Sequence, residues 1–92
     1  MTYSLVVTAG FEKRLTRFRR LHPELRVRLA ALFLDLETDP FAHQLRLHAL
    51  QGELAGLHEV RLTQSYRVIL TLRLAEQEIV LLDIGTRDEV YR

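Results

Sequence analysis

Residues Gly56–Arg73, GLHEVRLTQSYRVILTLR, decide the fold of this chain. Two runs of alternating apolar and polar residues, Leu57–Leu62 and Tyr66–Leu74, flank a polar turn, and this pattern is typical of a β-hairpin. Because side chains alternate across a strand, the second run presents one apolar face and one face that carries arginine. Arg61 and Arg67 stand on either side of the turn. If they project the same way, two arginines on rigid strands can clamp a phosphate.

The segment before this hairpin predicts one strand and two helices. Tyr3–Thr8 is β-branched and apolar, which indicates a first strand. Apolar residues at helical spacing then predict a helix over Ala9–Leu21, capped by Thr8 or Gly10. A second helix is expected to begin at Pro23, to end near Glu37 and to be largely buried. Four further apolar residues widen its apolar stripe: Val27, Ala30, Ala31 and Leu34.

The remaining segments complete an α+β domain. Phe41–Gly56 is interpreted as a connector, and Glu78–Ile84 predicts a last strand that is central or covered on both faces, with Gly85 ending it. The element order is therefore β-α-α-β-β-β. We expect an N-terminal strand and a two-helix hairpin packed on a four-stranded, mainly antiparallel sheet. The 92 residues form one domain, 1–92.

Composition narrows the classes of protein that this chain can belong to. It contains no cysteine, so disulfides and thiolate chemistry are excluded, and we expect neither a metal nor a cofactor. The start of the chain lacks the features of a signal peptide, and no apolar run approaches the roughly 18–20 residues of a membrane span. We therefore expect a cytoplasmic protein with no membrane partner.

The positive charge is almost all arginine. Of the 13 basic residues twelve are arginine, yet the net charge is only +1. Arginine suits bidentate phosphate contacts, although a genome rich in G and C encodes the same bias. Lys13, Arg17 and Arg20 fall on one side of the first predicted helix. This basic stripe is interpreted as either a solvated face or a face for RNA or a protein partner.

Three segments, taken together and in order, resemble a known family. They are FEKRLTRF near the start, HALQGELAGLHEVRLTQSYRVIL in the middle and LLDIGTRDEVYR at the end. The chain resembles the RelE/ParE superfamily of toxins from type II toxin–antitoxin pairs. The tail from Gly85 to Tyr91 is similar to that of the RelE-like nucleases. His48, in the motif His-x-Leu-x-Gly, is similar to the loop histidine of the YafQ-like group.

The resemblance implies a function. It implies an endoribonuclease, of the mRNA interferase type, that cuts mRNA in the ribosomal A site without metal and inhibits translation. It also implies a cognate antitoxin as partner. The alternative is a ParE-like toxin that binds and inhibits DNA gyrase and has no hydrolytic site. Convergence of Arg67, Arg87 and Tyr91 on one open pocket would favour the nuclease, whereas a large distance of Tyr91 and Arg87 from Arg67 would favour the gyrase inhibitor.

The resemblance also implies four catalytic residues. Arg67 would stabilise charge on the phosphate, and Arg87 would be a second clamp or would assist protonation of the leaving group. Tyr91 would stack on a base or orient the 2′-hydroxyl. His48 is the candidate for proton transfer, because histidine changes its charge between about pH 5 and pH 8. Arg61, together with the basic stripe, would bind RNA.

A structural role remains open for each of these residues. Arg67 can form an ion pair with Asp83, Tyr91 can pack on the sheet edge, and Arg61, Arg87 and His48 can be plain surface residues. His58 is interpreted as a partly buried strand residue. Four acids can be bases but fit ion pairs with arginine better: Glu53, Glu59, Asp88 and Glu89.

Overall fold

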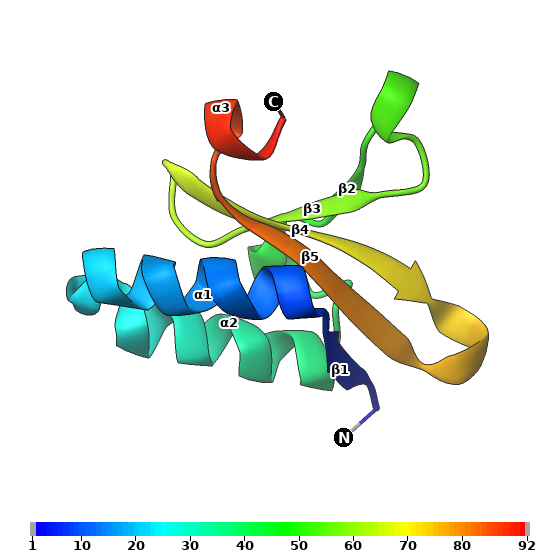
Figure 1. The fold of residues 1–92 in the computed structure, drawn as a ribbon. Helices are drawn as coiled ribbons and strands as arrows, with labels where there is room; N and C mark the ends of the chain where they lie inside the picture. The colour runs from blue at the N-terminus through cyan, green and yellow to red at the C-terminus, as the bar shows by residue number, and fades with distance from the viewer. Residues whose placement is uncertain (1, 92) are drawn as a thin grey trace.

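Two long helices lie along one face of a twisted five-stranded sheet (Figure 1). A computed structural model of the chain describes residues 2–91. The helices and strands, in chain order, are β1 (Ser4–Val7), α1 (Ala9–Leu21), α2 (Arg26–Thr38), β2 (His48–Ala49), β3 (His58–Arg61), β4 (Tyr66–Arg73), β5 (Glu78–Thr86) and α3 (Arg87–Val90). No helix within the described residues is long and apolar enough to cross a bilayer.

The sheet has the strand order β1-β5-β4-β3-β2. β1 pairs with β5 in parallel, and every other neighbouring pair is antiparallel. This arrangement confirms the predicted α+β class, the meander of the last three long strands and the interior position of the last strand. The expected number of four strands is wrong, because the segment interpreted as a connector contributes β2. β2 has only two residues, which is too short to produce an alternating pattern in the sequence.

α1 has the bounds that the sequence predicts. Thr8 is its N-cap, and the Oγ1 atom accepts a hydrogen bond from the backbone N–H of Phe11 at 3.2 Å. The same hydroxyl donates to the carbonyl of Leu81 at 2.9 Å, which ties the start of the helix to β5. Phe11, Leu15 and Phe18 are buried against the sheet, while the rest of the helix faces solvent.

α2 is less buried than the sequence suggests. Pro23–Leu25 forms a 3-10 turn, and the α-helix begins only at Arg26. Leu29, Leu32 and Leu36 are buried in the core. The expectation of a largely buried helix is wrong for the other side, where all four of the residues expected to widen the stripe are exposed: Val27, Ala30, Ala31 and Leu34. A helix in a single outer layer has only one face to pack, so the second apolar face stays in solvent.

The end of β5 places the C-terminal tail. The expectation that Gly85 ends the last strand is wrong, since Gly85 pairs with Arg67 and the strand runs on to Thr86. Thr86 and Glu89 then form a capping box, with Thr86 N donating to Glu89 Oε1 at 2.8 Å and Glu89 N donating to Thr86 Oγ1 at 3.3 Å. This reciprocal cap starts α3, so α3 leaves the sheet at a fixed angle and carries Tyr91 back over β3.

Candidate active site

Glu59 is a carboxylate buried on the sheet face that the long helices leave uncovered. Its neighbour Val60 points into the core, so Glu59 points the opposite way. Only 3% of Glu59 is exposed. A buried carboxylate is costly unless charged or hydrogen-bonding partners surround it. The partners of Glu59 therefore define the chemistry of this face.

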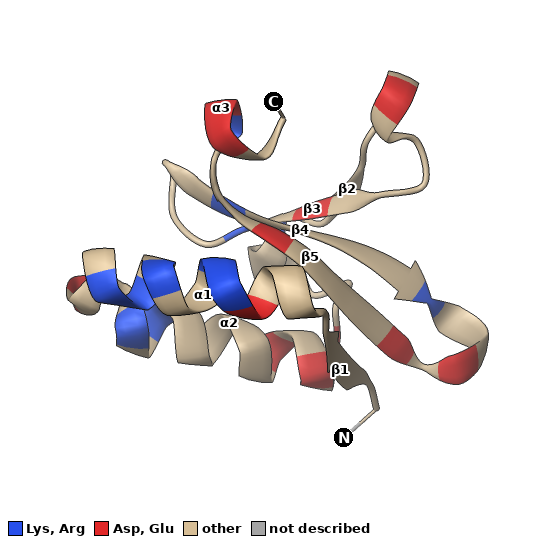
Figure 2. Cartoon of the chain, in the orientation of Figure 1, with Lys and Arg blue, Asp and Glu red and all other residues tan. Residues whose placement is uncertain are grey.

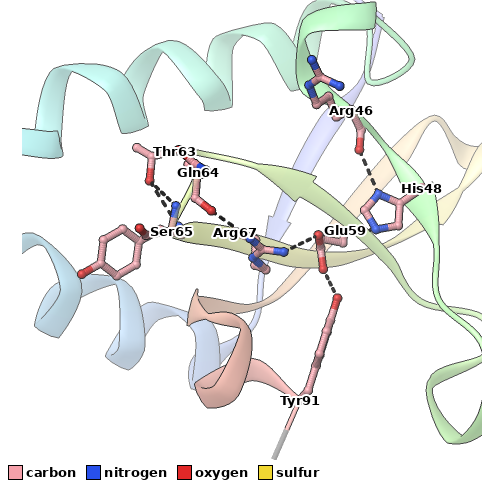
Figure 3. A network of polar contacts seen from close by, with 9 residues as sticks. Arg46, His48, Glu59, Thr63, Gln64, Ser65, Arg67 and Tyr91 are labelled. Atoms are coloured by element: carbon pink, nitrogen blue, oxygen red, sulfur yellow. Dashed lines mark hydrogen bonds and ion pairs between the residues drawn. The ribbon is translucent and has the colours of Figure 1, made fainter.

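Three side chains from distant parts of the sequence meet at Glu59 (Figure 3). Arg67 Nη1 donates to Oε2 at 3.0 Å, and the Tyr91 hydroxyl donates to Oε1. His48 Nε2 lies 3.4 Å from Oε2. We call these four residues the Glu59 cluster. Three of the four residues that the family resemblance implies as catalytic belong to it, and they come from β2, β4 and the tail.

His48 is the accessible member of the Glu59 cluster. The pairing of β2 with β3 sets His48 directly opposite Glu59, yet 54% of the histidine side chain is exposed. Its Nδ1 lies 3.1 Å from the carbonyl oxygen of Arg46. Both ring nitrogens thus face acceptor oxygens. The imidazolium form satisfies both, because it donates from each nitrogen.

Arg67 is the buried cation of the cluster. It is 7% exposed, and its Nη2 donates to the carbonyl of Gln64 at 3.1 Å. Its Nε is also buried and has no hydrogen-bond partner within residues 2–91. The alternative pairing with Asp83 is wrong, because Asp83 instead pairs with Arg14 of α1 at 3.2 Å. Arg67 therefore binds the Glu59 carboxylate from the buried side of the cluster.

Arg87 and Arg61 are exposed cations beside the cluster. Arg87 opens α3, and its guanidinium carbon lies 5.8 Å from the centre of the Tyr91 ring. Arg61 stands directly opposite Arg67 in the β3–β4 ladder, so the two project to the same face, but Arg61 is exposed. Both side chains are exposed, so each is accessible to an anionic ligand.

The basic stripe of α1 does not join the Glu59 cluster. Lys13, Arg17 and Arg20 are exposed and line a shallow hollow of about 310 Å³ on α1, which covers the other face of the sheet. Figure 2 shows the basic positions along α1 in blue. A larger cleft, of about 580 Å³, also lies outside the cluster, between α1 and α3 beside Tyr66. Its lining includes Arg17 but no member of the cluster.

The other candidate residues take structural places. His58 is partly buried, as expected, and its Nδ1 is buried without a partner among the described residues. Glu53 and Asp88 are exposed, and Glu89 belongs to the capping box. Within residues 2–91 no three His, Asp or Glu side chains form a group that could hold a metal ion. Glu59 was expected to pair with arginine and does so, but its position between His48 and Tyr91 left no signal in the sequence.

Comparison with known proteins gives matches at the level of structure alone. No protein-family model matches the sequence, and no curated protein does. The fold is similar to that of YafQ from Escherichia coli strain BL21(DE3), with a TM-score of 0.73, 16% identity and coverage of 98% of this chain and 99% of YafQ.

Two further solved structures agree with this match. A YoeB/ParE toxin from Agrobacterium tumefaciens has a TM-score of 0.77 and 19% identity over 91% of this chain and 98% of that toxin. A chain of the RelBE2 toxin–antitoxin complex from Mycobacterium tuberculosis has a TM-score of 0.72 and 23% identity over 95% of this chain and 100% of that one. Identities this low carry the fold and not the activity. The chain has the fold of the RelE/ParE toxins.

Proposed function

We propose that this chain is the toxin of a type II toxin–antitoxin pair and that it cleaves mRNA on the ribosome. One observation carries the proposal: His48, Arg67 and Tyr91 converge on the carboxylate of Glu59. Arg67 and Tyr91 meet at Glu59 and Arg87 lies beside the Tyr91 ring, a proximity that favours the nuclease over the gyrase inhibitor; Arg67 itself is buried rather than exposed in an open pocket. The RelE/ParE toxin fold supports the first part of the proposal, that the chain is a toxin.

The reaction uses the 2′-hydroxyl of the RNA as nucleophile. Its oxygen attacks the adjacent phosphorus, the bond from phosphorus to the 5′-oxygen breaks, and a 2′,3′-cyclic phosphate and a 5′-hydroxyl result. The site must accept a proton, stabilise charge on the phosphoryl oxygens and return a proton to the leaving oxygen. Each proton transfer by a positioned side chain is worth about 10²–10⁴-fold in rate. An active site on this chain therefore needs a titratable group within reach of the RNA.

His48 fills the role of proton donor to the leaving oxygen. Its ring is exposed at the mouth of the cluster, and its protonated form fits the two acceptor oxygens around it. The contact from Nε2 to Glu59 is the longer of the two, at 3.4 Å against 3.1 Å for Nδ1, so a substrate oxygen can compete for Nε2 more easily. The carbonyl oxygen of Arg46, 3.1 Å from Nδ1, keeps the ring oriented while Nε2 exchanges its contact with Glu59 for one with the substrate.

The buried arginine and the two exposed arginines have different electrostatic roles. Arg67 is covered, so it fixes the position of the Glu59 carboxylate and adds positive charge beneath the site. Arg61 and Arg87 are exposed, so they contact the phosphates on either side of the cleaved bond. The ring of Tyr91 offers a surface for a base next to that bond, and such stacking contributes about 1–3 kcal/mol.

The partner of this toxin would be a cognate antitoxin. The similar solved structures include toxin–antitoxin complexes of RelBE2 and of DinJ with YafQ. We infer that a segment of the antitoxin covers the open sheet face and thereby blocks access to His48. The ribosomal A site would present the mRNA to the same face.

Mapping of mRNA ends on translating ribosomes tests this function. Purified protein is added to a translation reaction, and we expect new 5′ ends within the codon in the A site. Replacing both exposed cations, in Arg61→Ala/Arg87→Ala, removes these ends if the two arginines hold the RNA. Arg73→Ala is the matched control, because Arg73 is an exposed arginine at the end of β4 that lies farthest from Arg67. Intact mRNA together with stalled gyrase–DNA complexes would overturn the proposal in favour of the ParE-like activity.

A further inference from the structure

The outer side of α2 carries a stripe of exposed apolar residues. Val27, Ala30, Ala31 and Leu34 have the spacing i, i+3, i+4, i+7, so they share one face of the helix. Val27 is 84% exposed and Leu34 is 60% exposed. The core residues of α2 occupy the opposite face, so nothing within the fold requires this second apolar face.

The charges beside this stripe are segregated by sign along the helix. Arg26 and Arg28 lie in the first turn of α2, while Asp35 and Glu37 lie in its last turn (Figure 2). None of the four forms an ion pair inside the part of the chain that the structure describes. Arg28 uses its Nε on the carbonyl of Leu62 at 2.9 Å.

This placement of charge is unfavourable for an isolated helix. The N-terminal end of a helix carries a partial positive charge and the C-terminal end a partial negative one, so acids are favoured at the start and bases at the end. α2 has no acid in its first turn and no base in its last turn, which is the reverse arrangement. A second α2 running antiparallel would bring acids to the basic end and arginines to the acidic end.

The spacing of these residues matches such an antiparallel pair. Arg28 and Asp35 are seven residues apart and flank the stripe on one side. Arg26 and Glu37 are eleven residues apart and flank it on the other side. About a two-fold axis at the middle of the helix, residue 28 of one copy lies level with residue 35 of the other, and residue 26 lies level with residue 37. Both flanks then pair opposite charges, as a self-complementary interface requires.

We propose that this chain forms a homodimer in which the α2 helices of two copies pack antiparallel through this stripe. The two alanines at its centre allow the helix axes to approach closely. A helix of this length is about 20 Å long and 10 Å wide, so the contact buries less than the roughly 800 Å² per partner of a standard interface. We therefore expect a weak dimer that forms only at high protein concentration. The Glu59 cluster stays open, since it lies on the other side of the sheet.

Sedimentation equilibrium on the purified full chain, over micromolar to millimolar concentrations, tests the dimer. We expect Leu34→Asp to leave a monomer. Leu74, in the β4–β5 turn, is a similarly exposed leucine, and Leu74→Asp should leave the dimer intact. Glu37→Arg should weaken the dimer about tenfold, because it places like charges together twice. Arg26→Glu combined with Glu37→Arg should restore it.

This rescue separates a contact between copies from an effect within one chain. Residues 26 and 37 are three turns apart on the same helix, so they cannot pair with one another. A chain that is monomeric at every concentration would overturn the proposal, as would a dimer that survives Leu34→Asp. A monomer whose Leu34→Asp variant fails to bind the antitoxin would assign the stripe to that partner instead. None of these results bears on mRNA cleavage.

Discussion

Replacing Arg67 with methionine should destabilise the fold because it strands the carboxylate of Glu59. Methionine replaces the aliphatic part of the side chain and removes most of the guanidinium group, with its charge and its hydrogen bonds. The two charged groups are 3.0 Å apart and both are buried. Removing one partner of a buried ion pair typically costs about 3–5 kcal/mol. The contacts of Glu59 with His48 and Tyr91 remain, so we expect a loss near the lower limit, about 3 kcal/mol.

Urea and thermal unfolding followed by circular dichroism measure this loss. A domain of this size shifts its melting temperature by roughly 4–8 °C for each kcal/mol, so Arg67→Met should melt about 12–24 °C below the wild type. Arg73→Met is the matched control on the same strand. Its ion pairs with Glu76 and Glu78 are exposed and 3.9 and 3.6 Å long, so its cost should be below about 1 kcal/mol.

A second substitution distinguishes a stranded charge from a packing defect. Glu59→Gln removes the carboxylate charge but keeps an oxygen that can accept from Tyr91. In the Arg67→Met background it should recover about 1–2 kcal/mol, since no unpaired charge is then buried. The reasoning is refuted if the double variant is as unstable as the sum of the two single variants, or if Arg67→Met costs no more than Arg73→Met.

Two further predictions concern the tail. Tyr91→Phe removes the hydroxyl that donates to Glu59, so it should lower the free energy of unfolding in urea by about 1–2 kcal/mol. Cleavage of mRNA should persist if the ring acts by stacking. An unchanged stability would show that the contact is not formed in solution. Thr86→Ala removes half of the capping box, so it should lower the free energy of unfolding by about 1 kcal/mol. Amide hydrogen exchange should become faster at Glu89 and stay the same at Leu70. Equal exchange at Glu89 in the wild type and the variant would contradict this account of α3.

The sequence predicts best the elements that have a long hydrophobic period. α1 has a cap, three buried aromatic or leucine positions and a proline after its end, and its bounds are correct to the residue. The last strand was predicted two residues short, because glycine usually ends a strand whereas Gly85 here keeps its pairing with Arg67. The sequence overestimates the burial of α2, because an apolar stripe has the same residue pattern whether the fold covers it or leaves it in solvent.

The sequence identifies some members of the candidate site. What it does not reveal is the tertiary contact that brings them together. The family resemblance pointed to His48, Arg67 and Tyr91, and those three do meet. Their meeting point, Glu59, depends on a two-residue strand whose pairing with β3 sets His48 across from it. No local pattern encodes that pairing. The ion-pair partner expected for Arg67 was wrong for the same reason. Asp83 pairs with Arg14 of α1, and this pairing depends on the bulge between β4 and β5 and on the position of α1, which no local pattern encodes.

The central claim is that the Glu59 cluster cleaves RNA, and the single-turnover cleavage rate of ribosome-bound mRNA tests it most directly. The comparison is between His48→Ala and His43→Ala, an exposed histidine five residues earlier that lies outside the cluster. We predict that His48→Ala lowers the rate by about 10²–10⁴-fold and that His43→Ala leaves it within about twofold. Equal rates for the two variants would contradict the account.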